Sequence, residues 1–344
     1  MSGGASADGP VIDAWWAEFV RTGRLPVSLE LVQQRLIRAV FRGDLPSGPV
    51  YVKTMTFPRP KDRLRYLLRA LPGAHEARML RATAAAGVPC PEVLAVRTAR
   101  RWGLPFRSLL VLRALPVQGA PEPVAARLRD AAALTARLLA AGIVHHDLHA
   151  GNFVRLSGGA LAVLDLQSAG VRGRRAMGRG CRIAVAARLL REHLAGDVGL
   201  GSELVAGGLL ADQVEVAAAR QQATRELDRF RRSRVLRCLG TSTEFRRQVS
   251  WRGIEYRLRG DLPEGRWLPA FPHARQVWLG QRALQVFEGR PPAFYALFRK
   301  WWWRVGKGAL YVPRECDQDR IELDLAAARE GHVRYHTQGS WPRA

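Results

Sequence analysis

The sequence contains few cysteines, and they are far apart. The four residues form neither a CxxC pair nor a zinc-binding pattern: Cys90, Cys181, Cys238 and Cys316. This spacing gives no support for a disulfide framework or a structural zinc site. It indicates a protein of a reducing compartment.

Long apolar runs are absent as well. The most apolar stretch, residues 131–144, is interrupted by Thr135 and Arg137. No transmembrane helix is expected, because a helix needs about 20 apolar residues to cross a bilayer. The first 19 residues lack a basic segment followed by an apolar core, which argues against a secretory signal. We therefore expect a cytoplasmic protein that does not span a membrane.

Negative charge is scarce. The chain has 54 Lys and Arg against 30 Asp and Glu, a net charge of +24, and its only lysines are Lys53, Lys61, Lys300 and Lys307. A GC-rich genome would produce the same arginine bias. A functional charge would instead predict an anionic partner, which could be a phosphorylated substrate, an acidic membrane surface or nucleic acid. Nucleic acid is the least favoured of these, because no recognised binding module is present.

Apolar patterns in the first 142 residues predict strands and helices in a definite order. With 344 residues, the chain is long enough for two domains or one two-lobed enzyme. Two strands are expected within 31–57, separated by the turn signal Pro-Ser-Gly, and a helix over 74–86 that stops at a glycine. Strands over 90–98 and 107–115 and a long helix over 122–142 follow.

Polar side chains are unusually dense in the stretch VHHDLHAGNFV, residues 144–154. A hairpin with a Gly-Gly turn follows, and it should bring Asn152 and Asp165 together at its two ends. One carboxylate and one amide oxygen can hold Mg²⁺, which takes its remaining ligands from phosphates and water. Asp147 would then be available to accept a proton from an attacking hydroxyl. The spacing therefore predicts phosphoryl transfer.

The same residues resemble the catalytic loop of protein kinases and their metal-binding D-F-G motif, here HHDLHAGN over 145–152 and Asp-Leu-Gln over 165–167. Lys53 in the strand VYVKTM and Glu76 on the next helix stand in the order of the kinase Lys–Glu pair. The form H-x-D-L-H-x-G-N is similar to the lipopolysaccharide kinase family (Kdo/WaaP type, including InaA-like proteins). Members use ATP to phosphorylate sugars of the lipopolysaccharide inner core in the cytoplasm.

This resemblance, which covers about residues 30–240, implies an α+β, bilobal, protein-kinase-like fold with an antiparallel-sheet N-lobe and a mostly helical C-lobe. It also implies ATP and Mg²⁺ as cofactors and an anionic glycolipid or sugar as acceptor, with peripheral contact to the inner face of the inner membrane. The implied roles are Asp147 as base or orienting group, His149 at the γ-phosphate, Asn152 and Asp165 as Mg²⁺ ligands, Lys53 at the α/β-phosphates held by Glu76, and Arg113 and Leu115 at the hinge that receives adenine. His145 is expected to brace the loop.

The expected divisions of the chain are an N-terminal, partly flexible segment (1–29), an N-lobe (30–116), a C-lobe (117–240) and a C-terminal extension (241–344). RGDLPSG at 42–48 recurs as RGDLPEG at 259–265. We interpret the extension as a candidate decayed copy of the N-lobe. Chance similarity in an Arg- and Leu-biased chain is the alternative.

Two departures from the kinase pattern keep other functions open. No GxGxxG motif covers the phosphates, Gly43 and Gly48 being the nearest candidates, and Asp-Leu-Gln replaces D-F-G. The alternatives are a phosphotransferase of the aminoglycoside or choline type and a non-catalytic pseudokinase that only binds. The basic segment 171–182 is a candidate acceptor-binding region, and the aromatic run 301–308 a candidate lipid contact. For both segments, solvated arginines are the alternative reading.

Overall fold

The computed structural model describes residues 7–34, 37–57, 63–64, 66, 70–118, 122–173, 178–194, 199–268, 273–300 and 307–337. The chain divides into two compact units, residues 1–223 and 224–344. The division falls inside helix α7 (Gln213–Leu236) rather than at residue 240.

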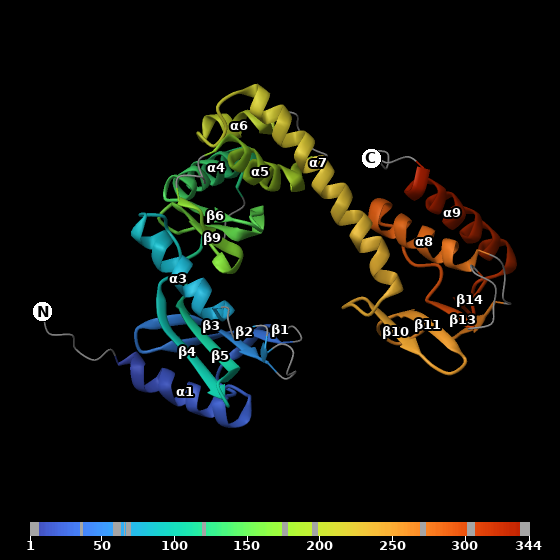
Figure 1. The fold of residues 1–344 in the computed structure, drawn as a ribbon, viewed down its shortest axis with the longest axis horizontal. Helices are drawn as coiled ribbons and strands as arrows, with labels where there is room; N and C mark the ends of the chain where they lie inside the picture. The colour runs from blue at the N-terminus through green and yellow to red at the C-terminus, as the bar shows by residue number, and fades with distance from the viewer. Residues whose placement is uncertain are drawn as a thin grey trace, which may run out of the picture. The chain divides into compact units, whose positions relative to one another are not determined.

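The first unit contains a five-stranded antiparallel sheet in the order β1-β2-β3-β5-β4 (Figure 1). The predicted Pro-Ser-Gly turn joins β2 to β3, where Leu45 pairs with Gly48. Both expected later strands are present and form a hairpin. The strands are β1 (Glu30–Gln34), β2 (Arg38–Leu45), β3 (Gly48–Thr56), β4 (Val93–Arg101) and β5 (Leu104–Arg113).

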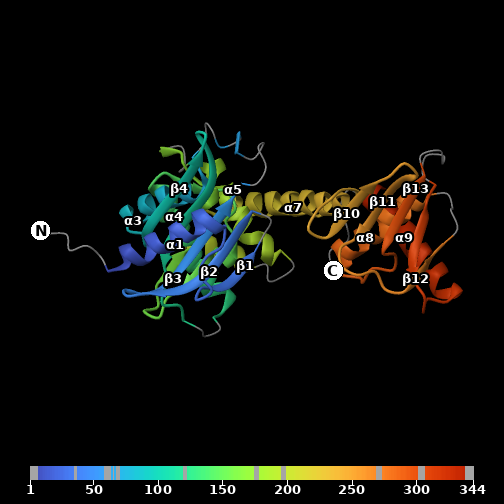
Figure 2. The same cartoon turned by 90° about the horizontal axis from the view of Figure 1, so that it is seen from below.

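One helix packs on each face of this sheet. Successive side chains of a strand point to opposite faces, and in β5 Leu109 and Val111 pack toward α1 (Asp8–Thr22), whereas Leu110 and Leu112 pack toward α3 (Pro72–Ala85). Figure 2 shows α1 lying across the strands. The expectation of a loose N-terminal segment is therefore wrong for residues 8–22, whose buried side chains Ile12, Trp15 and Phe19 cover the sheet.

The rest of the first unit is mostly helical and carries the polar loop between two short strand pairs. β6 pairs with β9, and β7 forms the predicted hairpin with β8. Together with the sheet this makes a bilobal, protein-kinase-like fold, as predicted. The elements are α4 (Val124–Ala140), β6 (Ile143–His145), η1 (Ala150–Asn152), β7 (Phe153–Arg155), β8 (Leu161–Val163), η2 (Leu166–Ser168), β9 (Ala169–Val171), α5 (Arg179–Leu190), η4 (Arg191–His193), α6 (Leu200–Ala206) and α7.

The second unit has its own core around the fully buried Trp278 of α8. Helices α8 and α9 cross closely, because a Cβ on Gly280 would lie 1.7 Å from the carbonyl oxygen of Ala328. The elements are the end of α7, η5 (Arg237–Leu239), β10 (Phe245–Val249), β11 (Gly253–Leu258), β12 (Gly265–Trp267), α8 (Ala274–Glu288), β13 (Ala296–Lys300), β14 (Ala309–Pro313) and α9 (Gln318–Thr337).

The sheet of the second unit has five strands, like the first, but another strand order, β10-β11-β13-β14-β12. The first heptapeptide, 42–48, closes the β2–β3 hairpin, whereas 259–265 joins β11 to β12, which are not neighbours. The proposed duplication stays a prediction, and the strand order does not add support to it.

Within the described residues, no helix is long and apolar enough to cross a membrane. The aromatic run 301–306 and the centre of the basic segment, residues 174–177, lie outside the described residues.

Candidate active site

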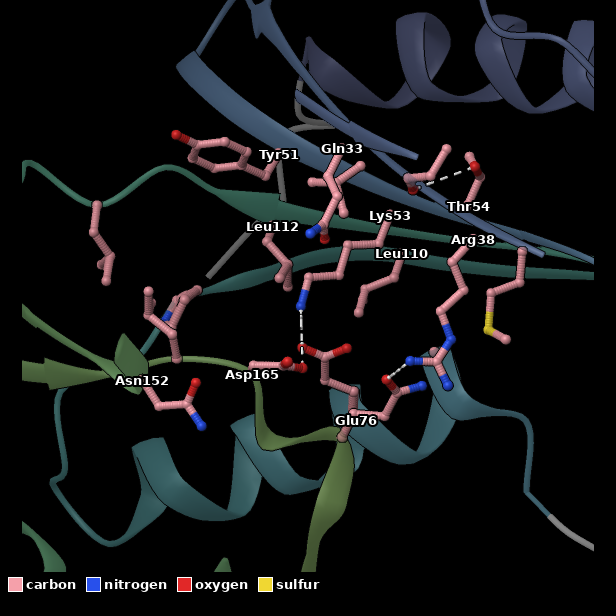
Figure 3. A pocket seen from close by; sticks show the side chains of 18 of the residues that line it. Gln33, Arg38, Tyr51, Lys53, Thr54, Glu76, Leu110, Leu112, Asn152 and Asp165 are labelled. Atoms are coloured by element: carbon pink, nitrogen blue, oxygen red, sulfur yellow. Dashed lines mark hydrogen bonds and ion pairs between the residues drawn. The ribbon is translucent and has the colours of Figure 1, made fainter. Parts of the chain in front are cut away.

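Lys53 and Glu76 form a close ion pair between the sheet and α3. The Nζ atom of Lys53 lies 2.6 Å from Oε1 of Glu76. The Glu76 side chain is only 3% exposed, against 28% for Lys53. Burial raises the pKa of Glu76, whereas the positive charges of Lys53 and Arg38 act in the opposite direction. The lysine thus holds a buried carboxylate and still presents its ammonium group to solvent (Figure 3).

Asp165 lies where the β7–β8 hairpin leads into η2, beside the same lysine. Its carboxylate oxygen is 3.6 Å from the Nζ atom of Lys53, and its side chain is 58% exposed. The backbone is left-handed there, with φ 52° and ψ 57°. A residue other than glycine seldom adopts this conformation, which costs on the order of 1 kcal/mol or more. In this conformation the Asp165 carboxylate lies beside the Nζ atom of Lys53 and lines the cavities described below.

His145 braces the polar loop against this segment, as expected. Its Nδ1 atom accepts a hydrogen bond from the backbone N–H of Asp147 at 3.2 Å, which leaves Nε2 to donate to the carbonyl oxygen of Asp165 at 3.0 Å. One nitrogen of the ring accepts and the other donates, which is the pattern of a neutral imidazole, and burial lowers the pKa of His145 in the same direction. The side chain of Ser168 lies 3.2 Å from Nδ1 and joins the same network.

The oxygen ligands expected for Mg²⁺ fit this arrangement. The side-chain amide nitrogen of Asn152 donates to the carbonyl oxygen of Asp147 at 2.8 Å. This bond fixes the nearly buried amide and turns its oxygen away from Asp147. An amide oxygen and the exposed carboxylate of Asp165, both on the wall of one cavity, suit a hard cation that takes its other ligands from phosphates and water.

Two adjoining cavities meet at these residues. The first, of about 440 Å³, lies between the sheet and the hairpin and contains Lys53, Glu76 and the apolar side chains Leu110, Leu112 and Leu115. The second, of about 560 Å³, contains Asp147. Among the described residues, the exposed carboxylate of Asp147 has no hydrogen-bond partner. The residues that line both cavities are Arg38, Asn152, Asp165 and Gln167.

The two residues expected at the hinge, Arg113 and Leu115, also line the first cavity. Their contact with adenine stays a prediction. The guanidinium group of Arg113 is already held by Glu92 at 2.7 Å and by the Ser47 carbonyl oxygen at 3.0 Å. Arg113 therefore ties the hinge to the β2–β3 turn.

Three sequence-based assignments do not match the positions observed. His149 lines neither cavity: its Nδ1 atom accepts the N–H of Gly151 at 3.1 Å and lies 3.8 Å from Glu192, so contact with a γ-phosphate does not follow from its position. Gly48 lies in the β2–β3 turn, away from both cavities. Gly43 is required for packing, because a Cβ there would lie 2.0 Å from Leu29.

Sequence reasoning missed two residues that the fold brings to the cavities. Arg38 begins β2 and Gln167 follows Asp165, and the Nη1 atom of Arg38 donates to Oε1 of Gln167 at 2.5 Å. Gln167 was noted only as a departure from D-F-G. Nothing distinguished Arg38 from the many other arginines of the chain.

Comparison with known protein families gives one match, which covers the sheet, the loop and the hairpin. Residues 33–180 match the model of the lipopolysaccharide kinase (Kdo/WaaP) family. Residues 33–180 are therefore similar to members of that family. The match agrees with the kinase-type loop and the Lys–Glu pair seen in the sequence.

Solved structures with similarity to the chain are also kinase-related. WbdD, in a co-crystal structure with the kinase inhibitor LY294002, is 17% identical, with a TM-score of 0.37, over 56% of this chain and 44% of that chain. The MAP kinase LmaMPK10 from Leishmania major is 15% identical, with a TM-score of 0.31, over 48% of this chain and 51% of that chain. A comparison with curated proteins found no match. The similarity to lipopolysaccharide kinases rests on the family match over residues 33–180.

Proposed function

We propose that this kinase transfers the γ-phosphoryl group of ATP, with Mg²⁺, to a sugar hydroxyl of a lipopolysaccharide-core-type glycolipid. The observation that carries the proposal is the pair of adjoining cavities. One contains the Lys53–Glu76 pair and an apolar end suited to adenine, and the other contains the unpartnered carboxylate of Asp147. Donor and acceptor would therefore meet where the cavities join.

The chain's own residues suffice for the steps that phosphoryl transfer requires. Lys53 would contact the α/β-phosphates, and Asn152 and Asp165 would hold Mg²⁺, which neutralises charge on the β- and γ-phosphate oxygens. Asp147 would orient the acceptor hydroxyl and take its proton. The hydroxyl oxygen forms a bond to the γ-phosphorus as the bond to the bridging oxygen breaks, and ADP leaves with that electron pair.

The acceptor class is supported by the family match and by charge. An inner-core sugar of a glycolipid carries anionic groups, and the chain has a net charge of +24. Arg38 and His75 line the cavity that contains Asp147. These groups favour an anionic acceptor over a neutral or cationic soluble alcohol, such as an aminoglycoside or choline.

We also propose peripheral contact with an anionic membrane surface at the cytoplasmic face of the inner membrane. The β4–β5 hairpin tip carries Trp102, which is 83% exposed, and the guanidinium carbon of Arg101 lies 4.8 Å from its ring centroid. Exposed tryptophan beside arginine suits the lipid headgroup region. A glycolipid acceptor would be presented at that surface.

The nucleotide part of the proposal is tested by thermal unfolding with and without Mg-ATP. The unmodified protein should gain about 2.7 kcal/mol at a hundredfold excess of ligand over Kd. Lys53→Ala and Asp165→Ala should abolish this gain. Arg42→Ala and Asp44→Ala are matched controls, since both residues are exposed on β2 and line neither cavity. A Mg²⁺-independent gain, or none in the unmodified protein, would count against the proposal.

The transfer part is tested with core glycolipids and soluble alcohols as acceptors. Asp147→Asn should keep Mg-ATP binding and lose about 10²- to 10⁴-fold in turnover. A protein that binds Mg-ATP but phosphorylates no acceptor, with or without Asp147, would be a pseudokinase. Preference for soluble alcohols would replace the glycolipid acceptor.

A further inference from the structure

Arg38 occupies the position from which a kinase ordinarily covers its phosphates. It is the first residue of β2, the strand that follows β1 in the chain and pairs with it. Its side chain is exposed and lines both cavities. The sequence has no glycine-rich motif there, so backbone N–H groups are not arranged by glycines to approach the phosphates. A positive side chain is present instead.

The two departures from the kinase pattern meet in one hydrogen bond. Arg38 takes the place where the glycine-rich loop is missing, and Gln167 stands where D-F-G would have its glycine. Although 129 residues apart in sequence, the two side chains are joined by the bond of 2.5 Å from Nη1 of Arg38 to Oε1 of Gln167. A glycine at 167 could not make this bond. In Figure 3, the side chains of Arg38 and Lys53 both extend from the sheet toward the helix that carries Glu76.

Among the described residues, no carboxylate forms an ion pair with the positively charged Arg38. Its partner Gln167 is neutral. Its charge nevertheless reaches the site, since it acts to lower the pKa of the Glu76 carboxyl, which burial raises. A guanidinium group held by one neutral hydrogen bond keeps further N–H donors for an anion.

We propose that Arg38 binds the terminal phosphate of the nucleotide in place of a glycine-rich loop, and that Gln167 is the positioning residue that holds it there. This rests on the proposed function. The terminal phosphate must lie where the nucleotide cavity meets the acceptor cavity, and Arg38 is a cationic residue on the wall of both. Guanidinium donors suit the oxygens of a transferring phosphoryl group, on which negative charge is spread. Lys53, which lines only the nucleotide cavity, is left to the inner phosphates.

The test compares Mg-ATP with Mg-ADP binding by calorimetry on the full chain. Arg38→Ala should weaken ATP binding about 10- to 100-fold, because charge-assisted hydrogen bonds to the terminal phosphate are lost. It should change ADP binding less than about threefold. Lys53→Ala should weaken both nucleotides. Arg42→Ala, four residues along the same strand, is the control and should change neither. Thermal unfolding without nucleotide checks that each variant is folded.

Gln167→Ala should weaken ATP binding by a smaller factor, again sparing ADP, and should add nothing when combined with Arg38→Ala. Arg38→Lys, which keeps the charge, should recover part of the affinity. The role of Arg38 would be overturned if Arg38→Ala lost ATP and ADP affinity equally. It would also be overturned if Arg38→Ala lost no affinity while Lys53→Ala lost affinity for both nucleotides. Neither result would contradict the proposed kinase function. No ATP binding by the unmodified protein would overturn both proposals.

Discussion

At the scale of single residues, the nucleotide site depends on an unequal ion pair. Glu76 is almost fully buried, whereas Lys53 is partly exposed and lies between Glu76 and Asp165. A buried carboxylate is costly unless a cation faces it, because burial removes its hydration. Lys53 therefore stabilises the fold around Glu76, and in the proposed function it would also present a positive charge to the phosphates.

Removing the lysine should produce a stability loss that depends on pH. In Lys53→Ala, burial keeps the pKa of Glu76 above its unfolded value of 4.5 with no ammonium group to oppose it. A carboxyl group whose pKa is raised in the folded state destabilises the fold once it ionises. The protein is therefore more stable at low pH and loses stability as the pH rises through the folded-state pKa of the group. We expect a loss of about 1–3 kcal/mol at pH 8 and a smaller loss at pH 5, measured by urea unfolding.

The double variant Lys53→Ala/Glu76→Gln is the control, because glutamine has no proton to lose. Its stability difference from Glu76→Gln alone should be the same at pH 5 and pH 8. If Lys53→Ala loses the same unfolding free energy at pH 5 and pH 8, removal of the lysine does not destabilise the ionised Glu76 carboxylate.

At the scale of elements, the C-lobe helices are joined at the start of α7. Asp212 accepts the N–H of Glu215 at 2.8 Å, and Glu215 in turn accepts the N–H of Ala211 at 2.9 Å, which is a reciprocal cap of the helix N-terminus. Glu215 also pairs with Arg182 of α5 at 2.8 Å. One carboxylate thus fixes both the beginning of α7 and its packing on α5.

The variant Glu215→Gln should lose this stabilisation in a pH-dependent way. The hydrogen bond from the Ala211 N–H and the pairing with Arg182 lower the pKa of Glu215 below 4.5, against the effect of desolvation. A carboxyl group whose pKa is lower in the folded state than in the unfolded state stabilises the fold at pH values above its unfolded-state pKa. That stabilisation is lost as the pH falls through the folded-state pKa. The unfolding free energies of the unmodified protein and Glu215→Gln should differ by about 1 kcal/mol at pH 7 and converge at low pH.

The comparison variant is Glu203→Gln, which changes another helix carboxylate of the C-lobe that pairs with an arginine. A difference in unfolding free energy between Glu215→Gln and the unmodified protein that persists at low pH would indicate altered packing.

At the scale of the whole molecule, the strained β4–β5 turn carries an exposed aromatic side chain. Trp102 and Gly103 form a two-residue hairpin loop with φ values of 52° and 76°. Such a loop favours Asn-Gly, and a tryptophan at positive φ costs on the order of 1 kcal/mol. Residues 99–104 contain two arginines and no acidic residue. An exposed, strained tryptophan contributes little to folding, and this supports a role in binding an anionic bilayer.

The variant Trp102→Asn should therefore raise stability and lower membrane affinity together. We expect a gain of about 1 kcal/mol in unfolding free energy and about a tenfold weaker association with vesicles that contain anionic lipid, measured by sedimentation. Leu323→Ala, which removes an exposed apolar side chain flanked by Glu322 and Asp324 on α9, should bind vesicles normally. Unchanged vesicle binding by Trp102→Asn would exclude this tip as the contact.

Local sequence determined much of this protein. The turn signals, the strand and helix periods and the loop 144–154 predicted the order of elements, the β7–β8 hairpin and the candidate roles of Asp147, Asn152 and Asp165. These features could be read because each is set by neighbours within a few residues, through backbone conformation and short-range pairing.

Only the tertiary structure decided the remaining features. The Arg38–Gln167 bond joins residues 129 positions apart, and helix α1 is ordered by the sheet it covers. His149 turns toward its own loop rather than toward the cavities. The second sheet arranges its strands in an order that the repeated heptapeptide did not predict. Each of these outcomes depends on the packing of distant segments, for which a single sequence of many arginines and leucines has no local signal.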